Sequence, residues 1–139
     1  MVQSLNKILE SYKKSIQGKK AAVLGFGISN RPLAKTLAGW GAKVTVFDRK
    51  KEEAFEDILT EYRNLDVKFS FGDKYLDNLS GFDIIFRTPG MRFDIPQIQK
   101  EVANGAELTS EMEVFMKCCP AVTYAVTGSD GKTTTTSLI

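Results

Sequence analysis

Short apolar runs alternate with helix-like segments along most of this 139-residue chain. Strand-like runs fall at residues 21–24, 44–47, 67–71, 83–86, 106–108 and 122–126, and helical patterns fall at residues 4–16, 29–38, 52–63, 95–103 and 110–117. Crossover connections through helices place successive strands parallel to one another. The alternation therefore predicts an α/β fold, namely a Rossmann-like, doubly wound, mostly parallel sheet with helices on both faces. In such sheets, ligands bind beyond the carboxyl ends of the strands.

The composition is typical of a soluble globular protein, with 42% hydrophobic and 26% charged residues. The net charge of +2 is too small to favour nucleic acid or an acidic membrane as a partner. No apolar stretch approaches the ~20 residues that a membrane span needs. Lys7, Glu10 and Lys13 interrupt the apolar positions near the N-terminus, so no signal peptide is predicted. Together these features predict a cytoplasmic protein.

The sequence lacks the residues for zinc binding and for histidine-assisted nucleophilic catalysis. It contains no histidine, and its two cysteines, Cys118 and Cys119, are adjacent. Adjacent cysteines rarely bond to each other, so we expect two reduced thiols that serve in packing. A zinc site would have almost no ligands, and the Ser–His and Cys–His routes to an activated nucleophile are excluded.

Two helix starts carry capping signals. Ser29 or Asn30 can cap the helix that runs to about residue 38, and Pro32 fits the first turn of that helix. Ser110 and Glu113 have the spacing of a capping box, which predicts that a helix opens at residue 110.

The first candidate site is a glycine loop between a predicted strand and a predicted helix. Its residues are Gly25, Phe26, Gly27, Ile28, Ser29 and Asn30, with Asn30 in place of the third glycine of the dinucleotide fingerprint. Glycines let the backbone approach a diphosphate, and the helix start offers free N–H groups. Asp48, which ends the next strand, is placed to accept hydrogen bonds from a ribose or a base. The loop fits a nicotinamide or flavin dinucleotide or a nucleotide diphosphate sugar, unless it is only a turn that needs positive φ.

The second candidate site is a compact phosphate-binding loop that follows the apolar run 122–126. Its residues are Gly128, Ser129, Asp130, Gly131, Lys132, Thr133 and Thr134. Successive N–H groups would hold the phosphates of ATP, Lys132 would reach the β- and γ-oxygens, and the Thr133 hydroxyl would bind Mg²⁺. Val126 stands where the general P-loop pattern has its first glycine. The alternative is a solvated turn before a threonine-rich tail.

The third candidate is the turn over residues 87–91, at the end of the predicted strand 83–86. Pro89 and Gly90 are typical of a type II turn, and a plain turn of this kind is the interpretation that requires no ligand. Thr88, Pro89 and Gly90 nevertheless follow a strand end that faces the first glycine loop, so they are candidates for a second ligand-contacting loop.

These three motifs, in this order, resemble the Mur ligase family of peptidoglycan synthesis, and in particular its branch that adds D-glutamate to UDP-N-acetylmuramoyl-L-alanine. The matching segments are residues 23–30, 41–48, 88–90 and 126–135. The resemblance implies a UDP-sugar-binding domain over residues 1–119, with the start of an ATP-binding domain over residues 120–139. It implies an ATP-dependent enzyme that activates a carboxylate as an acyl phosphate before the D-glutamate amine attacks.

The resemblance also implies roles for individual residues. The backbone of Gly25 to Ser29 would meet the diphosphate, Asp48 and Arg49 would face the uridine, and the loop from Thr88 to Gly90 would line the sugar diphosphate. Lys132 would be the catalytic residue and Mg²⁺ would neutralise charge on the transferring oxygens. Asn30 and Asp130 depart from the glycine and asparagine that are frequent in the family.

Family members are several-fold longer than this chain and have three domains. The resemblance therefore implies that most of the ATPase domain and the D-glutamate site are absent here. We expect the chain alone to be inactive and monomeric, and the tail from about Gly128 to be poorly ordered or packed differently, because a short helix without its sheet is marginal in water.

Two other functions fit part of the sequence. An NAD(P)-binding domain of an oxidoreductase would explain Gly25, Gly27 and Asp48, but it leaves residues 128–136 without a role. A nucleotide-sensing module without catalytic activity is the other possibility.

Overall fold

The computed structural model describes residues 2–139, and it describes their side chains from Lys7 onward. A sheet of five parallel strands, in the order β3-β2-β1-β4-β5, forms the centre of the molecule. The strands are β1 (Lys20–Leu24), β2 (Lys43–Asp48), β3 (Val67–Phe71), β4 (Ile84–Phe86) and β5 (Glu107–Thr109). The predicted α/β class and the parallel sheet are confirmed.

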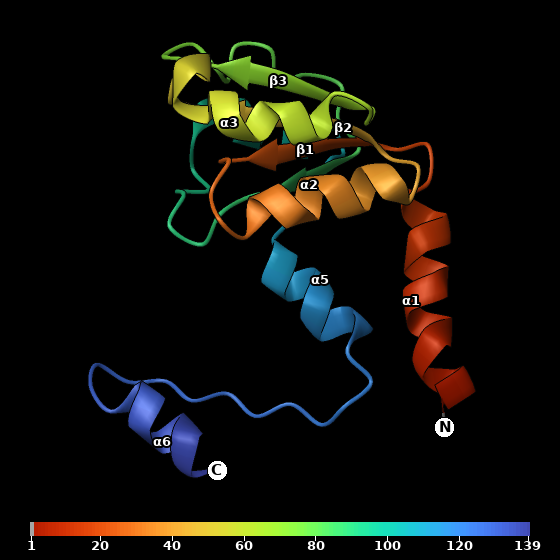
Figure 1. Cartoon of the computed structure of the whole chain (residues 1–139), viewed down its shortest axis with the longest axis vertical. Coiled ribbons are helices and arrows are strands. Elements are labelled where there is room, and N and C mark those ends of the chain that lie inside the picture. Colours follow the sequence, from red (N-terminus) through yellow and green to blue (C-terminus); the bar gives the residue numbers. More distant parts are fainter. Residues whose placement is uncertain (1) are drawn as a thin grey trace.

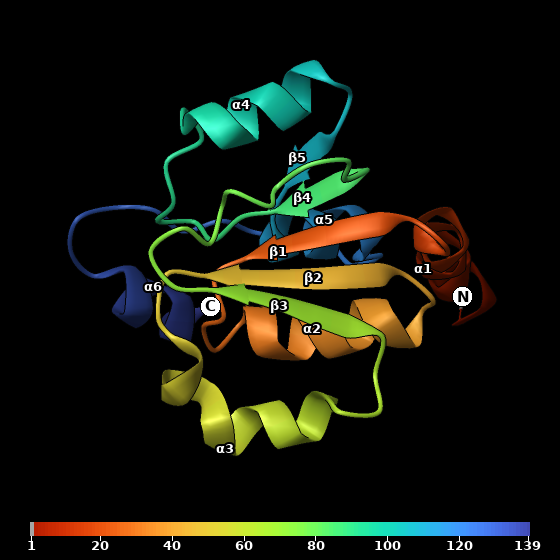
Figure 2. The same cartoon turned by 90° about the horizontal axis from the view of Figure 1, so that it is seen from above.

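Helices cover both faces of the sheet, as predicted (Figure 1 and Figure 2). The helices are α1 (Val2–Ile16), α2 (Asn30–Gly39), α3 (Glu56–Leu59), α4 (Pro96–Ala103), α5 (Glu111–Cys118) and α6 (Lys132–Leu138). Figure 2 shows α2 and α3 on one face and α4 on the opposite face. None of the helices in the described part of the chain has the length and apolar character that crossing a bilayer requires.

The strand order creates a switch point beside β1. The chain moves outward from β1 to β2 and β3, and then returns to the other side of β1 to form β4 and β5. The connections that leave β1 and β4 therefore diverge on opposite faces of the sheet while starting from the same edge. Open parallel sheets leave a crevice at such a point.

Two hydrophobic cores lie on the two faces of the sheet. Val23, Val46 and Phe86 pack on the face that α1, α2 and α5 cover. Leu24 and Ile85, their neighbours along the strands, pack on the face that α4 covers. Because successive strand residues point to opposite faces and both faces are covered, the strands read as continuous apolar runs.

The predicted helix over residues 52–63 is irregular, and an aromatic cluster lies at its break. This helical segment consists of η1 (Glu52–Phe55), α3 and η2 (Thr60–Tyr62), and η1 and η2 are 3-10 helices. The Phe55 ring stacks on Phe71 and meets Phe26 edge-on, with ring centroids 5.1 and 5.2 Å apart. Phe55 has φ −126° and ψ 7°, outside the α-helical region. Burial of this ring thus coincides with the break in the helix.

The predicted strand over residues 122–126 is wrong, because this run is irregular in the structure. A strand needs hydrogen-bonding partners along its length, and no other strand of the described residues lies beside this run. Val122 and Tyr124 are 80% and 81% exposed. The segment runs away from the sheet to α6 (Figure 1).

The capping box at the start of α5 is confirmed in its main contact. The Ser110 hydroxyl accepts a hydrogen bond from the Glu113 backbone N–H at 3.2 Å. The Glu113 carboxylate accepts from the Thr109 hydroxyl at 3.1 Å, so it fastens the end of β5 to the first turn of α5. This helix start is therefore fixed relative to the edge of the sheet.

Glu101 on α4 is a buried carboxylate that organises the turn before β4. It is 2% exposed, and its Oε2 accepts hydrogen bonds from the N–H groups of Gly81 and Phe82 at 2.9 and 3.3 Å. A buried N–H group that loses its acceptor costs about 1–3 kcal/mol. We expect Glu101→Ala to lower the free energy of unfolding by about that amount, measured by urea denaturation.

Glu101→Gln is the matched control, because its amide oxygen can still accept a hydrogen bond. It should lose less stability than Glu101→Ala. Equal stability of the wild type and Glu101→Ala would show that the carboxylate does not hold this turn.

Candidate functional site

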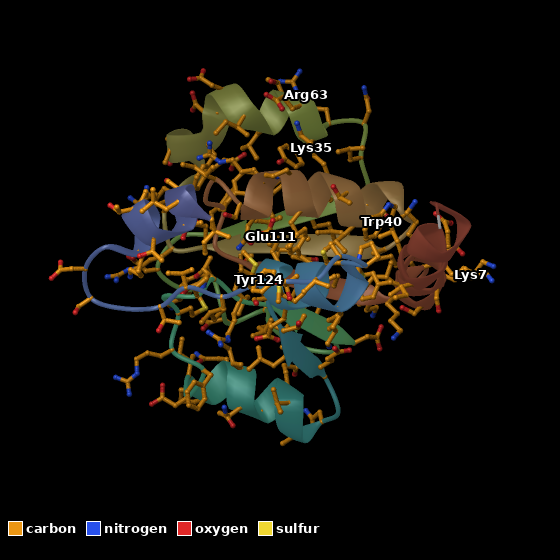
Figure 3. The ribbon with its side chains drawn as sticks, turned by 90° about the horizontal axis from the view of Figure 1, so that it is seen from below. Lys7, Lys35, Trp40, Arg63, Glu111 and Tyr124 are labelled. Carbon is orange, nitrogen blue, oxygen red and sulfur yellow. The ribbon has the colours of Figure 1, made fainter. Side chains whose placement is uncertain are left out.

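A cavity of about 460 Å³ lies where the loops that follow β1, β4 and β5 meet. Residues 27–30, 87–89 and 110–112 line it. It therefore lies at the carboxyl edge of the sheet, where the β1–β4 switch point leaves a crevice. The start of α5 lies close to α2 there, and Figure 3 labels Glu111 at that start. A hollow of about 540 Å³ beside β3 contains none of the predicted site residues.

Gly25 brings two of these loops together. Its N–H donates to the Phe47 carbonyl at 2.6 Å, so the loop stays paired with β2 just beyond β1. Its φ is +92°, and a Cβ atom at this position would lie 2.9 Å from Cγ2 of Thr88. Only glycine combines that backbone angle with so close an approach to the β4 loop.

Asp48 and Asn30 hold the glycine loop from inside. The Asp48 carboxylate accepts from the Phe26 N–H at 2.7 Å and from the Lys50 N–H at 2.8 Å. The Asn30 side chain is 3% exposed and donates to the carbonyls of Leu24 and Gly25 at 3.1 and 3.0 Å. Asn30, which stands where the fingerprint has a third glycine, thus closes the loop through its own amide group.

The second half of the glycine loop presents free backbone donors. Gly27, Ile28 and Ser29 are exposed, and within the described residues their N–H groups have no hydrogen-bond acceptor. Ser29 occupies the N-cap position of α2, but its side chain makes no capping bond. The predicted cap by Ser29 or Asn30 is therefore wrong, because the Asn30 amide turns back to the loop. Pro32 lies in the first turn as predicted.

Phe26 contributes only its backbone to the loop surface. Its side chain is 1% exposed and packs against Phe55, Tyr62 and Phe69. The Arg31 guanidinium lies over the Phe26 ring, 5.6 Å from its centroid, and Nε donates to the Phe26 carbonyl at 3.0 Å. This anchoring leaves the exposed half of the loop on a rigid base.

Tyr62 supports the first turn of α2. Its hydroxyl donates to the Arg31 carbonyl at 2.7 Å. Burial, with a smaller contribution from the neighbouring Glu61, raises the pKa of Tyr62 to about 12. The phenol is protonated at neutral pH, as an ordinary tyrosine is, and the raised pKa keeps this donor available to higher pH.

The loop after β4 forms the opposite wall of the cavity. The Met91 N–H donates to the Thr88 carbonyl at 3.0 Å, which closes the predicted turn. Gly90 lacks the positive φ that a type II turn requires at that position, so the expected turn type is wrong. Thr88 and Pro89 line the cavity, whereas Gly90 does not.

Arg87, Ser110, Glu111 and Met112 also line the cavity, although the sequence did not identify them as site residues. Arg87 is the first residue of the candidate turn over residues 87–91, so a cation beside a suspected phosphate site was a usable signal. The other three reach the cavity because β5 lies beside β4. Local sequence gives no indication of that pairing.

Residues 128–134 do not reach this cavity. Every residue from 120 to 139 is exposed except the half-buried Val126. Gly128 and Gly131 have φ +152° and +75°, and α6 begins at Lys132 directly after them. The segment thus has the order of a glycine loop followed by a helix start. In the described residues, no group of three or more His, Cys, Asp or Glu side chains could hold a metal ion.

The family model of the N-terminal domain of MurD-like Mur ligases matches residues 19–110. The chain belongs to this family. Among curated MurD-like relatives, the UDP-N-acetylmuramoylalanine–D-glutamate ligases of Ruminiclostridium cellulolyticum and Acetivibrio thermocellus are 58% and 55% identical over 97% of the chain. The chain spans 29% of the length of each.

Solved structures support the fold of this MurD-like domain. The A chain of dipicolinate synthase from Bacillus subtilis has a TM-score of 0.55 at 16% identity, over 84% of this chain and 41% of its own. The corresponding subunit from Bacillus halodurans has a TM-score of 0.54 at 16% identity, over 86% of this chain and 46% of its own. At this identity the likeness concerns the fold alone.

The two glycines of the loop should respond differently to alanine. Gly25→Ala combines positive φ with a contact at 2.9 Å, so we expect it to lower the free energy of unfolding by about 2–4 kcal/mol. Gly27→Ala meets nothing within 4 Å, and its stability should stay within about 0.5 kcal/mol of the wild type. Thermal unfolding of both variants tests this, and similar losses would refute the assigned role of Gly25.

Proposed function

We propose that this chain is the UDP-binding part of a ligase that joins D-glutamate to UDP-N-acetylmuramoyl-L-alanine. The observation that carries this proposal is the exposed run of free N–H groups at Gly27, Ile28 and Ser29, at the start of α2 and inside the cavity. A helix start combines unsatisfied donors with the positive end of the helix dipole, so it binds phosphate well. The names of the curated relatives, UDP-N-acetylmuramoylalanine–D-glutamate ligases, support a uridine nucleotide as the ligand.

The remaining predicted residues fit around that diphosphate. Thr88 and Pro89 line the same cavity and would contact the sugar diphosphate. Asp48 is the last residue of β2 and Arg49 follows it, at the same edge of the sheet, where a uridine would extend from the diphosphate. Both Asp48 oxygens already accept backbone hydrogen bonds, so their remaining lone pairs would serve the ligand.

The ATP-dependent chemistry would need a protein as long as the curated relatives, of which this chain spans 29%. ATP would phosphorylate the L-alanyl carboxylate, which gives an acyl phosphate and ADP. The D-glutamate amine would then form the amide bond and release phosphate. Lys132 would neutralise charge on the transferring phosphoryl oxygens, and the Thr133 hydroxyl would bind Mg²⁺. The glycine loop followed by a helix start at residues 128–138 supports this assignment.

We place the protein in the cytoplasm, where UDP-linked precursors are made, and expect a monomer. An NAD(P)-binding oxidoreductase domain would use the same free N–H groups, so ligand preference has to separate the two functions.

Ligand-induced stabilisation should distinguish these functions. We expect UDP-N-acetylmuramoyl-L-alanine and UDP to raise the unfolding temperature of the 139-residue chain, and NAD and NADP to leave it unchanged. A ligand present at a hundred times its dissociation constant adds about 2.7 kcal/mol to stability. Stabilisation by NAD without stabilisation by the UDP-sugar would overturn the proposal.

The chain alone should be inactive as a ligase. With ATP, Mg²⁺, D-glutamate and UDP-N-acetylmuramoyl-L-alanine present, we expect no phosphate release that depends on D-glutamate. A coupled phosphate assay measures this. D-glutamate-dependent release above a control without the UDP-sugar would show that residues 1–139 contain a complete active site.

A further inference from the structure

We infer that Arg87 binds the ligand directly, through contact of its guanidinium with the diphosphate of the nucleotide. This inference rests on the proposed function and concerns the first residue of the third sequence motif, which was not among the predicted site residues Thr88, Pro89 and Gly90. It depends on where the Arg87 backbone is fixed, on how few partners its side chain has, and on the charges around the cavity.

The backbone of Arg87 is fixed at the switch point. Arg87 follows the last residue of β4, and its N–H donates to the Thr109 carbonyl of β5 at 2.9 Å. The next residue, Thr88, is in contact range of the Gly25 position on the first glycine loop. The side chain therefore starts from the sheet edge, on a loop that touches the loop with the free N–H groups.

The Arg87 side chain is poorly satisfied by the protein. It is half-buried, and its only hydrogen bond among the described residues runs from Nη1 to the Met91 carbonyl at 3.4 Å, which is long for an N–H donor. No carboxylate of the described residues forms an ion pair with it. A guanidinium has five N–H donors, and burying a charge without partners is costly. An anion in the cavity would supply the missing acceptors.

Arg87 carries the positive charge of this cavity. Among the cavity-lining residues, Arg87 is the one cation and Glu111 the one anion. Glu111 is exposed in the first turn of α5. Arg31, the nearest arginine in sequence to the glycine loop, is held over Phe26 and Phe55 and does not line the cavity.

A diphosphate matches this arrangement better than a neutral ligand. Residues 27–29, which have unused N–H groups, and Arg87 line one cavity from two loops. A diphosphate carries acceptor oxygens on both phosphate groups, so it can accept from both loops at once. Arginine suits this role because its planar group makes paired, charge-assisted hydrogen bonds to phosphate oxygens.

The test uses Arg87→Gln and Arg87→Lys in the 139-residue chain, with UDP, uridine and inorganic diphosphate as probes in isothermal titration calorimetry. We expect Arg87→Gln to weaken UDP and diphosphate binding about tenfold or more, and to leave uridine binding unchanged, because uridine has no phosphate. Arg87→Lys should give an intermediate loss, since it retains the charge but loses the paired geometry.

Arg92→Gln is the matched control. Arg92 lies five residues further along the same connection, its side chain is 81% exposed, and it pairs with Asp94. It does not line the cavity, so its removal should change UDP affinity less than twofold. Thermal unfolding of each variant without ligand shows whether the fold is kept.

Each outcome separates the inference from the proposed function. Unchanged UDP affinity in Arg87→Gln, or an equal loss for UDP and uridine, would overturn the direct contact. Diphosphate binding that depends on Arg87, without any preference for UDP over inorganic diphosphate, would support the contact. It would contradict the assignment of uridine to the ligand. A wild-type chain that binds none of the three probes would overturn both.

Discussion

The position of β1 between β2 and β4, with all three strands parallel, is the constraint on which the candidate site depends. Parallel strands end at one edge, so the loops after β1, β2 and β4 leave side by side. The chain covers one face of the sheet on the way to β3 and the other face on the way to β5. The loops at the switch point consequently diverge and leave a cavity rather than packing closed.

The two halves of the glycine loop have different structural roles. Its first half belongs to the core, because the Phe26 ring is buried and the N–H groups of Gly25 and Phe26 are used by β2 residues. Its second half belongs to the surface, because residues 27–29 are exposed with unused N–H groups. The buried half supplies rigidity, and the exposed half supplies the donors. A loop with unused donors would otherwise be mobile, since no acceptor among the described residues holds these N–H groups.

Two arginines near the cavity have different surroundings because their tertiary neighbours differ. Arg31 lies on the first turn of α2 and is engaged with aromatic rings and the Phe26 carbonyl. Arg87 directly follows β4, and its side chain makes one long hydrogen bond among the described residues. From sequence, Arg31 stands nearer the glycine motif, yet it is the one that serves packing. Which arginine lines the cavity depends on strand order and on the aromatic residues of the helical segment that precedes β3.

The sequence by itself determined the alternation of strands and helices, the parallel sheet, and the two loops that meet at its edge. These features follow from local apolar periodicity and from glycine and proline chemistry, which act over a few residues. The sequence-based prediction was wrong at residues 122–126, because an apolar run becomes a strand only beside a hydrogen-bonding partner strand. It also failed at the α2 cap, because the Asn30 amide found acceptors inside the loop. Only the tertiary structure could bring Arg87, Ser110 and Glu111 to one cavity, because the pairing of β4 with β5 joins segments about twenty residues apart through backbone hydrogen bonds that carry no side-chain signature.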